Sequence, residues 1–520
     1  MNYPTWNFPH IGSGWVIGII AIVHVLISHF AIGGGFYLPM AERKALREKR
    51  DDWMQVLHGH AKFFLILTAV FGAMTGIGIW FAISLANPEG TSTLIHNFVF
   101  AWAIEWVFFL VEVTAAAVYY YTWGRIPDKL HLQVGWLYAF SAWVSLFVIN
   151  GILTFMLTPG PAWLQVAGTG REATAFWPAF FNPTFWPSLF LRTLVCISLA
   201  GIWALVTASR IDAFAQPKLK EEILRWSAKW LIPAYVLMPV FFAWYLYLVP
   251  GEQRTLLALG VSTIGQGTFT QVTRTVLVTI MTSATIAVIV YFLAWRNPRD
   301  FSFSHACATL FLALAATAST EQAREMLRKP YVVGGYLYSN GVRISERDKF
   351  NQEGYLAHSP WVLEAEQAAW SAAPQDTPEK KAEQIIRGEL MMRGQCIACH
   401  TRDGYRSLKR LLKERDREAI DNMLKMLHEM PKDSPYRAFM PPLVGTESER
   451  AALGDYLEVM RGKPELPSGT TAAGAAPGSA AQTPTAPPTP SGGAAPAPAA
   501  PAPAQPAEPA GGAAAVPGKQ

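Results

Sequence analysis

Long apolar runs, almost free of charge, dominate the chain up to about residue 320. A helix needs roughly 20 predominantly apolar residues to cross the hydrocarbon core of a bilayer, and a helix in a soluble core needs no such length. The runs predict eight membrane-spanning helices, at about 15–39, 63–86, 97–122, 132–156, 187–208, 230–249, 275–295 and 303–319. We therefore expect an all-α fold, with a polytopic membrane helix bundle over residues 1–320.

Basic residues alternate between the connections that join these spans. The connections 40–62, 123–131, 209–229 and 296–302 carry six, two, five and two Lys or Arg residues, whereas 87–96 carries none and 157–186 carries one. Cytoplasmic loops carry the excess of positive charge, so the N-terminus and everything after the eighth span should lie outside the cytoplasm. We expect a multi-pass protein of the bacterial inner membrane.

Two cysteines and a histidine stand together in Cys396-Ile397-Ala398-Cys399-His400. This spacing is that of a covalently attached c-type haem, in which two thiols bind the porphyrin and the adjacent imidazole becomes the proximal iron ligand. A structural zinc site would need two further ligands nearby, and a thioredoxin-like dithiol would need a βαβ context. The sequence offers neither, so it predicts one haem c on Cys396, Cys399 and His400.

A Met-Pro-Pro sequence that begins at Met440 lies downstream of this motif. A haem held by His and Met needs a thioether on its opposite face, carried on a stiff loop. Met423, Met426 and Met430 are also in reach, but they fall in an amphipathic helical pattern that is typical of core methionines. We expect Met440 to be the second axial ligand, and residues 385–463 resemble a small class I cytochrome c domain.

The rest of the C-terminal part is polar. Residues 321–384 predict a connector with helical stretches at Glu321–Arg328 and Lys329–Asn340, lying along the membrane surface. A predicted helix at Glu447–Arg461 closes the cytochrome c domain, and residues 464–520 are rich in Pro, Ala, Gly, Ser and Thr, which predicts a disordered tail. The charge pattern places this domain in the periplasm, the side on which bacteria attach c-type haem.

Four ionisable residues fall inside predicted spans: His24 and His29 in the first, and Glu105 and Glu112 in the third. Such a side chain at bilayer depth costs several kcal/mol unless it is paired, so each is a candidate functional residue. The glutamates are seven residues apart, about two helical turns, and share one face. The histidines are five apart, roughly 500° around the helix, and cannot both ligate one iron.

Depth arranges these four residues in two levels. A rise of about 1.5 Å per residue places His24 and Glu105 roughly 12–14 Å below the outer surface, and His29 and Glu112 roughly 21–23 Å below it. Our hypothesis is that His24 ligates a membrane haem with Glu105 beside it, while Glu112 and His29 form a proton relay from the cytoplasmic side. The alternative is a buried His–Glu pair that joins two helices.

Other histidines are weaker candidates. His10 and His96 lie near the outer interface, where a ligand role competes with simple solvation. His58, His60, His131 and His305 lie at predicted cytoplasmic ends and are expected to be structural or to take up protons.

Several short segments carry a family resemblance. They are Val23-His24-Val25-Leu26, the glycine run before Pro39-Met40-Ala41-Glu42, the G-x-x-x-G of Gly72 and Gly76, Ala103-Ile104-Glu105-Trp106 with Glu112, Trp123-Gly124-Arg125, and Asn150-Gly151. Over residues 10–160 the chain resembles subunit I of the cytochrome bd quinol oxidases. The resemblance implies that His24 is a haem ligand, that Glu105 and Glu112 serve haem ligation or proton delivery, and that one or more b-type haems, a second membrane subunit and quinone are involved.

The later part departs from that family. The fifth span, Pro187–Ser209, lacks the histidine that ligates the family's low-spin haem, and the connection 250–274 is too short for its quinol-binding loop. A ninth helix is replaced by the connector and the cytochrome c domain. The chain resembles a divergent bd-like member fused to cytochrome c.

These features predict a membrane electron-transfer haem protein, an oxidoreductase of terminal-oxidase type that passes electrons between the c haem and a membrane b haem, where oxygen is reduced. Two alternatives stay open: a quinol dehydrogenase that delivers electrons to periplasmic acceptors, and a non-catalytic membrane anchor for a cytochrome c. Expected partners are periplasmic or membrane electron-transfer proteins. The modest net charge of +5 gives no reason to expect a nucleic-acid partner.

Overall fold

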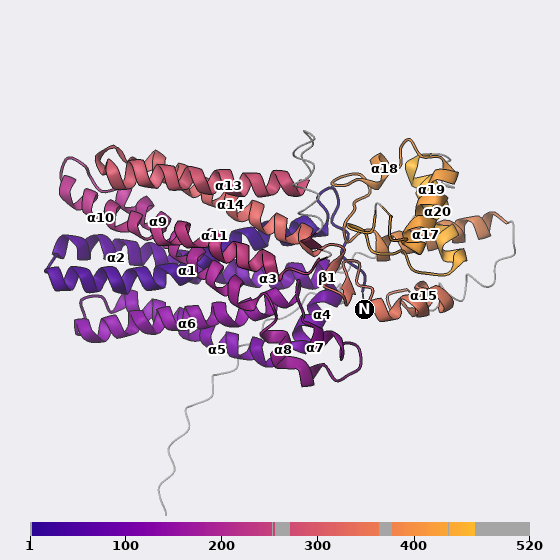
Figure 1. The fold of residues 1–520 in the computed structure, drawn as a ribbon, viewed down its shortest axis with the longest axis horizontal. Helices are drawn as coiled ribbons and strands as arrows, with labels where there is room; N and C mark the ends of the chain where they lie inside the picture. Colours follow the sequence, from indigo (N-terminus) through magenta and orange to yellow (C-terminus); the bar gives the residue numbers. More distant parts are fainter. Residues whose placement is uncertain (1–2, 252, 255–270, 363–376, 435, 463–520) are drawn as a thin grey trace, which may run out of the picture. The chain divides into compact units, whose positions relative to one another are not determined.

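The computed structural model describes residues 3–251, 253–254, 271–362, 377–434 and 436–462. Within these ranges the regular secondary structure is helical apart from one short hairpin (Figure 1). The predicted tail, most of the connection 250–274 and part of the connector lie outside the described residues.

The elements of the membrane part are α1 (Ser13–Glu48), α2 (Asp51–Leu65), η1 (Ile66–Gly72), α3 (Ala73–Ala86), α4 (Pro88–Asn97), α5 (Val99–Tyr121), α6 (Asp128–Phe155), α7 (Pro161–Leu164), η2 (Glu172–Ala175), α8 (Phe176–Phe180), α9 (Phe185–Ser209), α10 (Pro217–Lys229), α11 (Leu231–Leu248), α13 (Gln271–Ile289), η3 (Val290–Arg296), η4 (Pro298–Asp300) and α14 (Phe303–Arg328). The remaining elements are β1 (Tyr331–Val333), β2 (Leu337–Tyr338), η5 (Ile344–Glu346), α15 (Arg347–Glu353), η6 (Leu356–His358), α17 (Pro378–Gln395), α18 (Leu408–Leu411), α19 (Arg417–Glu429) and α20 (Glu447–Arg461).

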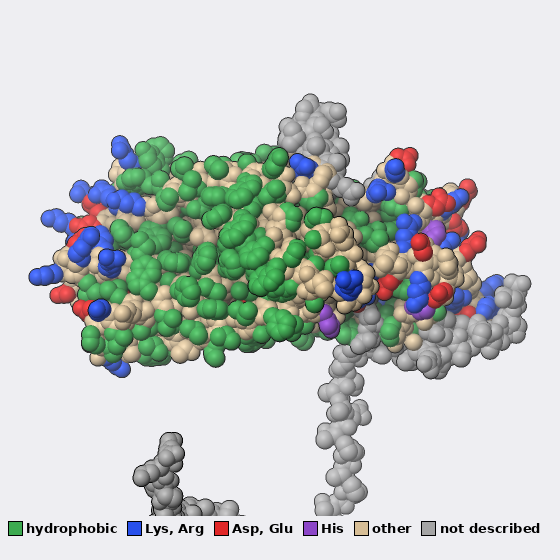
Figure 2. Space-filling model, turned by 60° about the horizontal axis from the view of Figure 1, so that its bottom comes forward, with side chains coloured by type: hydrophobic (Ala, Val, Ile, Leu, Met, Phe, Trp, Pro, Cys, Tyr) green, Lys and Arg blue, Asp and Glu red, His purple; other side chains and the backbone are tan. Residues whose placement is uncertain are grey.

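The eight predicted spans are confirmed. Among the described residues, eight continuous helical segments are long and apolar enough to cross a membrane, and each overlaps one predicted span. Figure 2 shows a broad apolar surface over these helices on the face in view, with Lys and Arg side chains gathered at one end of the bundle. At that end Arg50 forms ion pairs with Asp52 and Glu222, at 2.8 and 2.7 Å. The protein is therefore a multi-pass membrane helix bundle.

Three consecutive glycines, Gly33–Gly35, make α1 the centre of this bundle. A Cβ on the first would lie 1.9 Å from the backbone oxygen of Cys196 on α9, and one on the second 2.6 Å from the ring of Phe64 on α2. A Cβ on the third would lie 2.4 Å from the ring of Tyr138 on α6. The absence of side chains thus lets three different helices pack directly on the α1 backbone.

The predicted surface helices after the last span are corrected in two ways. Glu321–Arg328 does not lie apart from the spans, because it forms the last two turns of α14, where Arg324 donates to Glu321 at 2.6 Å. Lys329–Asn340 is not helical: β1 and β2 pair antiparallel, with Tyr331 opposite Tyr338. Two consecutive valines favour a strand, and Gly335 adopts the positive φ of 70° that the turn requires.

The C-terminal helices form a separate small core. Helices α17 and α20 cross so closely that a Cβ on Gly388 would lie 2.0 Å from the backbone oxygen of Ala452 and 2.6 Å from Cβ of Tyr456. Met391 and Leu453 are fully buried beside this crossing. The predicted closing helix Glu447–Arg461 is confirmed as α20, which begins with a capping box formed by Thr446 and Glu449.

The buried carboxylate of Glu449 fastens the connector to this core. Its Oε2 accepts from the backbone N–H of Tyr355 at 2.9 Å and of Thr446 at 2.9 Å, and its Oε1 accepts from the N–H of Leu356 at 2.8 Å. Hydrogen bonds to an ionised acceptor are stronger than those between neutral groups. One side chain therefore holds the start of α20 and the connector together.

Candidate functional site

The Cys-x-x-Cys-His turn directly follows α17. Cys396 caps the C-terminus of that helix, and both thiols are free of any disulfide. The Nδ1 atom of His400 donates to the backbone oxygen of Arg406 at 2.9 Å, because a carbonyl can only accept. Its Nε2 atom is then an acceptor, the form in which a histidine ligates iron. This donor set fits a covalently attached haem.

The segment that carries Met440 is fastened beside this turn. Gln395, which precedes Cys396, donates from Nε2 to the backbone oxygen of Val444 at 2.8 Å and accepts from the N–H of Val444 at 2.9 Å. The N–H of Met440 donates to the backbone oxygen of Tyr436 at 2.8 Å, which shapes the turn before the two prolines. The side chain of Met440 is half-buried. The structure thus brings together the two segments from which the sequence predicts haem ligands.

The same turn contacts the N-terminal end of α1. The N–H of Tyr405 donates to the backbone oxygen of His10 at 2.6 Å, and the hydroxyl of Ser13 donates to the backbone oxygen of Ile397 at 3.3 Å. The rings of Trp15 and Tyr405 pack edge to face, with centroids 5.7 Å apart. The predicted haem c turn therefore packs against the N-terminal end of α1, the helix that also carries His24 and His29.

His24 lies farther along α1, opposite α3. The Thr75 hydroxyl donates to the backbone oxygen of Phe71 at 2.7 Å, so its oxygen accepts from Nδ1 of His24 at 3.0 Å. The Nε2 atom of His24 is again left as an acceptor. A Cβ on Gly76 would lie 3.3 Å from Cε1 of His24, which gives the predicted G-x-x-x-G motif a packing role. The π-helical segment η1 ends just before this contact, and such segments are frequent at functional sites.

Glu105 lies at the level of His24. Trp80 is one turn beyond Gly76 on α3, and Trp102 is one turn before Glu105 on α5; their ring centroids are 4.6 Å apart. Because α3 runs toward the side where α5 begins, Gly76 and Glu105 share a depth. This agrees with the upper of the two predicted levels.

Glu105 and Glu112 both face α6. Glu105 accepts from the hydroxyl of Ser145 at 3.0 Å, and Glu112 accepts from the hydroxyl of Tyr138 at 3.0 Å. The partners are seven residues apart, as the glutamates are, which confirms that the two carboxylates share one face. The Tyr138 hydroxyl also lies 3.1 Å from the backbone oxygen of Ala31 on α1, so Glu112 stands near the level of His29.

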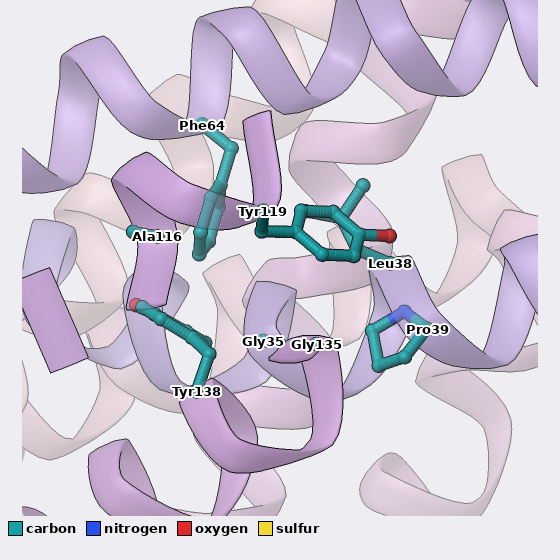
Figure 3. Close-up of a pocket in the computed structure, with 8 residues that line it drawn as sticks. All are labelled: Gly35, Leu38, Pro39, Phe64, Ala116, Tyr119, Gly135 and Tyr138. Atoms are coloured by element: carbon teal, nitrogen blue, oxygen red, sulfur yellow. The ribbon is translucent and has the colours of Figure 1, made fainter. Parts of the chain in front are cut away.

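The ring of Tyr138 packs against Phe64 and against Gly35, beside a cavity of about 10 Å³ (Figure 3). The cavity is lined by the apolar faces of these rings and by Tyr119 and Gly135, and it offers space for about one water molecule. It contains no ionisable side chain other than the two tyrosines. We assign it no chemistry.

The proposed relay between Glu112 and His29 is not formed by a direct hydrogen bond in the described residues. Nδ1 of His29 donates to the backbone oxygen of Val25 at 2.8 Å, and the electrostatic neighbours of its ring include Arg192 on α9 and Glu321 on α14. His24 and His29 point in different directions, as their spacing predicts. The alternative of a buried His–Glu pair joining two helices is likewise not found for these four residues.

The sequence analysis did not single out the charged residues near His29, which are Arg192, Glu321 and Arg324. Arg192 lies inside the fifth predicted span, and Glu321 and Arg324 directly follow the eighth, where they were assigned to the connector. Arg324 donates to Glu321 from Nε and Nη2, at 3.0 and 2.6 Å. The signal was present, since an arginine within an otherwise uncharged span requires a partner. In the structure Glu321 of α14 is an electrostatic neighbour of both Arg192 and His29.

The remaining histidines have structural partners. His58 stacks on Tyr120 and Trp123, His60 lies 2.8 Å from the hydroxyl of Thr207, His96 donates to the backbone oxygen of Ser92 at 2.8 Å, and His305 completes the capping box of α14. His131 donates from Nε2 to the backbone oxygen of Tyr119 and contacts Glu42 at 2.7 Å through Nδ1. Glu42 also accepts from the Tyr119 hydroxyl, at 2.6 Å, deep in the bundle.

Comparisons with known proteins agree with the resemblance. Residues 13–258 match the family model for cytochrome bd terminal oxidase subunit I. Cytochrome bd ubiquinol oxidase subunit 1 of Bacillus subtilis (strain 168) is 26% identical over 166 residues, 32% of this chain and 35% of the relative. The matched part thus spans about a third of that relative's length.

A solved structure shows the same fold. The bd oxidase of Geobacillus thermodenitrificans aligns with a TM-score of 0.51 at 16% identity, covering 62% of this chain and 88% of that chain. At this identity the likeness concerns the arrangement of the helices. Residues 13–258 of the protein form a helical domain similar, in sequence and in fold, to subunit I of the cytochrome bd terminal oxidases.

Proposed function

We propose that this chain is a cytochrome c-linked respiratory electron-transfer subunit of the bacterial inner membrane. Cys396 and Cys399 would hold one haem c covalently, with His400 and Met440 as its iron ligands, on the periplasmic side. His24 ligates a non-covalent b-type haem within the bundle. When bound, these groups would supply one-electron redox chemistry, which at the membrane haem would include the reduction of oxygen.

The contact between the Cys-x-x-Cys-His turn and α1 is the observation that carries this proposal. Ser13, which bonds to Ile397, and His24 lie on the same helix, eleven residues apart, so about 16 Å of helix separates them. The two predicted ligand sets are therefore fixed relative to one another by a rigid element. A mere anchor for a cytochrome c would need neither this proximity nor a half-buried histidine with a free Nε2.

The other residues of the site have supporting roles in the proposal. The carbonyl of Arg406 and the hydroxyl of Thr75 orient the rings of His400 and His24 through their Nδ1 atoms. Glu105 and Glu112 hold protons at two depths on one face of α5, with Ser145 and Tyr138 as their hydrogen-bond donors. His29 stands apart from them, and its place in a proton relay would require a further group between α1 and α5.

Partners follow from the same likeness. The Bacillus subtilis relative is named subunit 1 of a ubiquinol oxidase, and we propose that this chain also works with a second membrane subunit. The c-type domain replaces quinol as the electron donor in this proposal, with a periplasmic or membrane electron-transfer protein as its partner. In the opposite direction, quinol would be oxidised in the membrane and electrons would leave through the c-type domain.

Haem stoichiometry and reactivity test the proposal. Pyridine-haemochrome analysis of the purified full-length protein should give one c haem and at least one non-covalent haem. Adding oxygen to the reduced protein should reoxidise it rapidly, and carbon monoxide should shift an absorption band of the membrane haem. A c haem alone would reduce the protein to an anchored electron carrier, and reduction of the c haem by added quinol would establish the reverse direction.

Three variants assign the ligands. His24→Ala should remove the b-type spectrum and keep the c-type spectrum, whereas a Cys396→Ala/Cys399→Ala variant should do the reverse. His96→Ala is the matched control, because His96 lies in the membrane part and, among the described residues, its side chain bonds only to Ser92 of its own helix. An unchanged b-type spectrum in His24→Ala would refute the assignment of His24.

A further inference from the structure

A second, larger cavity opens between α1, α6, α9 and the α10–α11 junction. Its volume is about 450 Å³, within the usual range of small-molecule sites. Its lining is apolar over almost its whole surface and includes Phe36, Trp143, Ile197 and Trp230. Lys229 is the only charged side chain among the lining residues.

The polar end of this cavity has two unused hydrogen-bond donors. Lys229 is exposed and forms no salt bridge with any described residue. Trp226, three residues earlier and on the same face of α10, has a buried indole N–H without a hydrogen-bond partner in the described part of the chain. Both residues line the cavity, and an exposed ammonium beside an otherwise apolar cavity suits a group that is anionic at one end and hydrocarbon at the other.

We propose that this cavity binds an anionic phospholipid of the inner leaflet. The phosphate accepts hydrogen bonds from Lys229 and the Trp226 indole, and one acyl chain fills the space lined by Phe36, Trp143 and Ile197. Lys229 closes the connection 209–229, which the charge pattern places on the cytoplasmic side, where the membrane carries anionic lipids. A prenyl quinone has no anionic head, so it would leave Lys229 unpaired. The proposal does not depend on the haem assignments.

Native mass spectrometry of the full-length protein, equilibrated with nanodiscs of phosphatidylglycerol and phosphatidylethanolamine, tests this site. The protein should retain one phosphatidylglycerol molecule in preference to phosphatidylethanolamine. Lys229→Gln should weaken that retention about tenfold, because it removes a charge-assisted hydrogen bond. Lys218→Gln, at an exposed lysine of α10 that does not line the cavity, is the matched control and should retain the lipid normally.

A second variant separates the hydrocarbon contact from the charge. Ile197→Trp fills part of the cavity and leaves Lys229 in place, so it should also lower retention of phosphatidylglycerol. Equal retention by the wild type and Lys229→Gln would overturn the proposal. So would equal retention of the two lipids, or the recovery of a quinone or a helix of a companion subunit from this cavity.

Discussion

The crossing of α17 and α20 makes a sharp prediction about Gly388. In Gly388→Ala the new Cβ would start 2.0 Å from the backbone oxygen of Ala452. Ordinary contact needs roughly 3.4 Å or more, so the helices must move apart by about 1.4 Å. Overpacking of this kind costs about 1–3 kcal/mol, and we take the upper end because the obstacle is backbone. The better helix propensity of alanine returns about 1 kcal/mol, which leaves a net loss of about 2 kcal/mol.

Hydrogen exchange of the full-length protein measures this loss locally. A destabilisation of about 2 kcal/mol should raise the exchange rates of the core amides of α17 and α20 by about thirtyfold. Amides of α1–α14 should be unaffected. Global probes such as circular dichroism would be dominated by the membrane helices, so a readout by segment is needed.

Gly454→Ala is the matched control, on α20, the other helix of the crossing. A Cβ there would meet only the ends of the Asp421 and Arg417 side chains, at 2.8 and 2.9 Å, and both can move aside. Its exchange rates should stay within a few-fold of wild type. If Gly388→Ala exchanged as slowly as wild type, or if both variants were equally destabilised, the reasoning from helix contact would be wrong.

Three further changes test other contacts. Glu449→Gln places an amide N–H₂ where backbone N–H groups need an acceptor, so it should cost about 2–4 kcal/mol and speed exchange at the start of α20; a wild-type rate would contradict the described role of the carboxylate. Burial lowers the pKa of His428 below 6.5 and outweighs the hydrogen bond that the ring donates to the Leu443 carbonyl. Unfolding therefore takes up a proton, so the C-terminal core should become less stable as the pH drops below about 6.5. In His428→Asn this pH dependence should flatten, as hydrogen exchange measured at several pH values would show. His131→Leu leaves Glu42 buried with one partner fewer and should lower the stability of the bundle by about 3–5 kcal/mol, measured as the thermal midpoint in detergent, whereas Glu42→Leu/His131→Leu should recover much of it.

Much of the fold could be predicted from patterns among residues that are close together in the sequence. Eight spans follow from apolar run length, and the shared face of Glu105 and Glu112 follows from their seven-residue spacing. Each depends on residues that are near one another along the chain. The structure agrees with all of them because helical geometry and bilayer thickness leave few alternatives.

Contacts between distant segments could not be read in the same way. Which side chain meets Glu112 depends on how α5 packs against α6, and the partner of Arg192 depends on where α14 lies. The turn at Lys329–Asn340 was misjudged because its tyrosines suited an interfacial helix, while two valines and a glycine turn decided for strands. The hydrogen bond between His10 and Tyr405 joins two backbone groups, so no pattern of side chains could have predicted it.

Packing at the three glycines of α1 also fixes the direction in which His24 and His29 point from the same helix. Each glycine contacts a different helix, so a rotation or a shift of α1 would bring its side chains or backbone into a clash with a ring or a carbonyl of a neighbouring helix. The rotational setting of the helix is thereby fixed nine residues from His24 and four from His29. Inserting one residue between His24 and Gly33 would turn His24 by about 100° away from Thr75, whereas an insertion of seven residues would restore its direction one level higher. The length of this short stretch is thus as much a part of the site as the side chains in it.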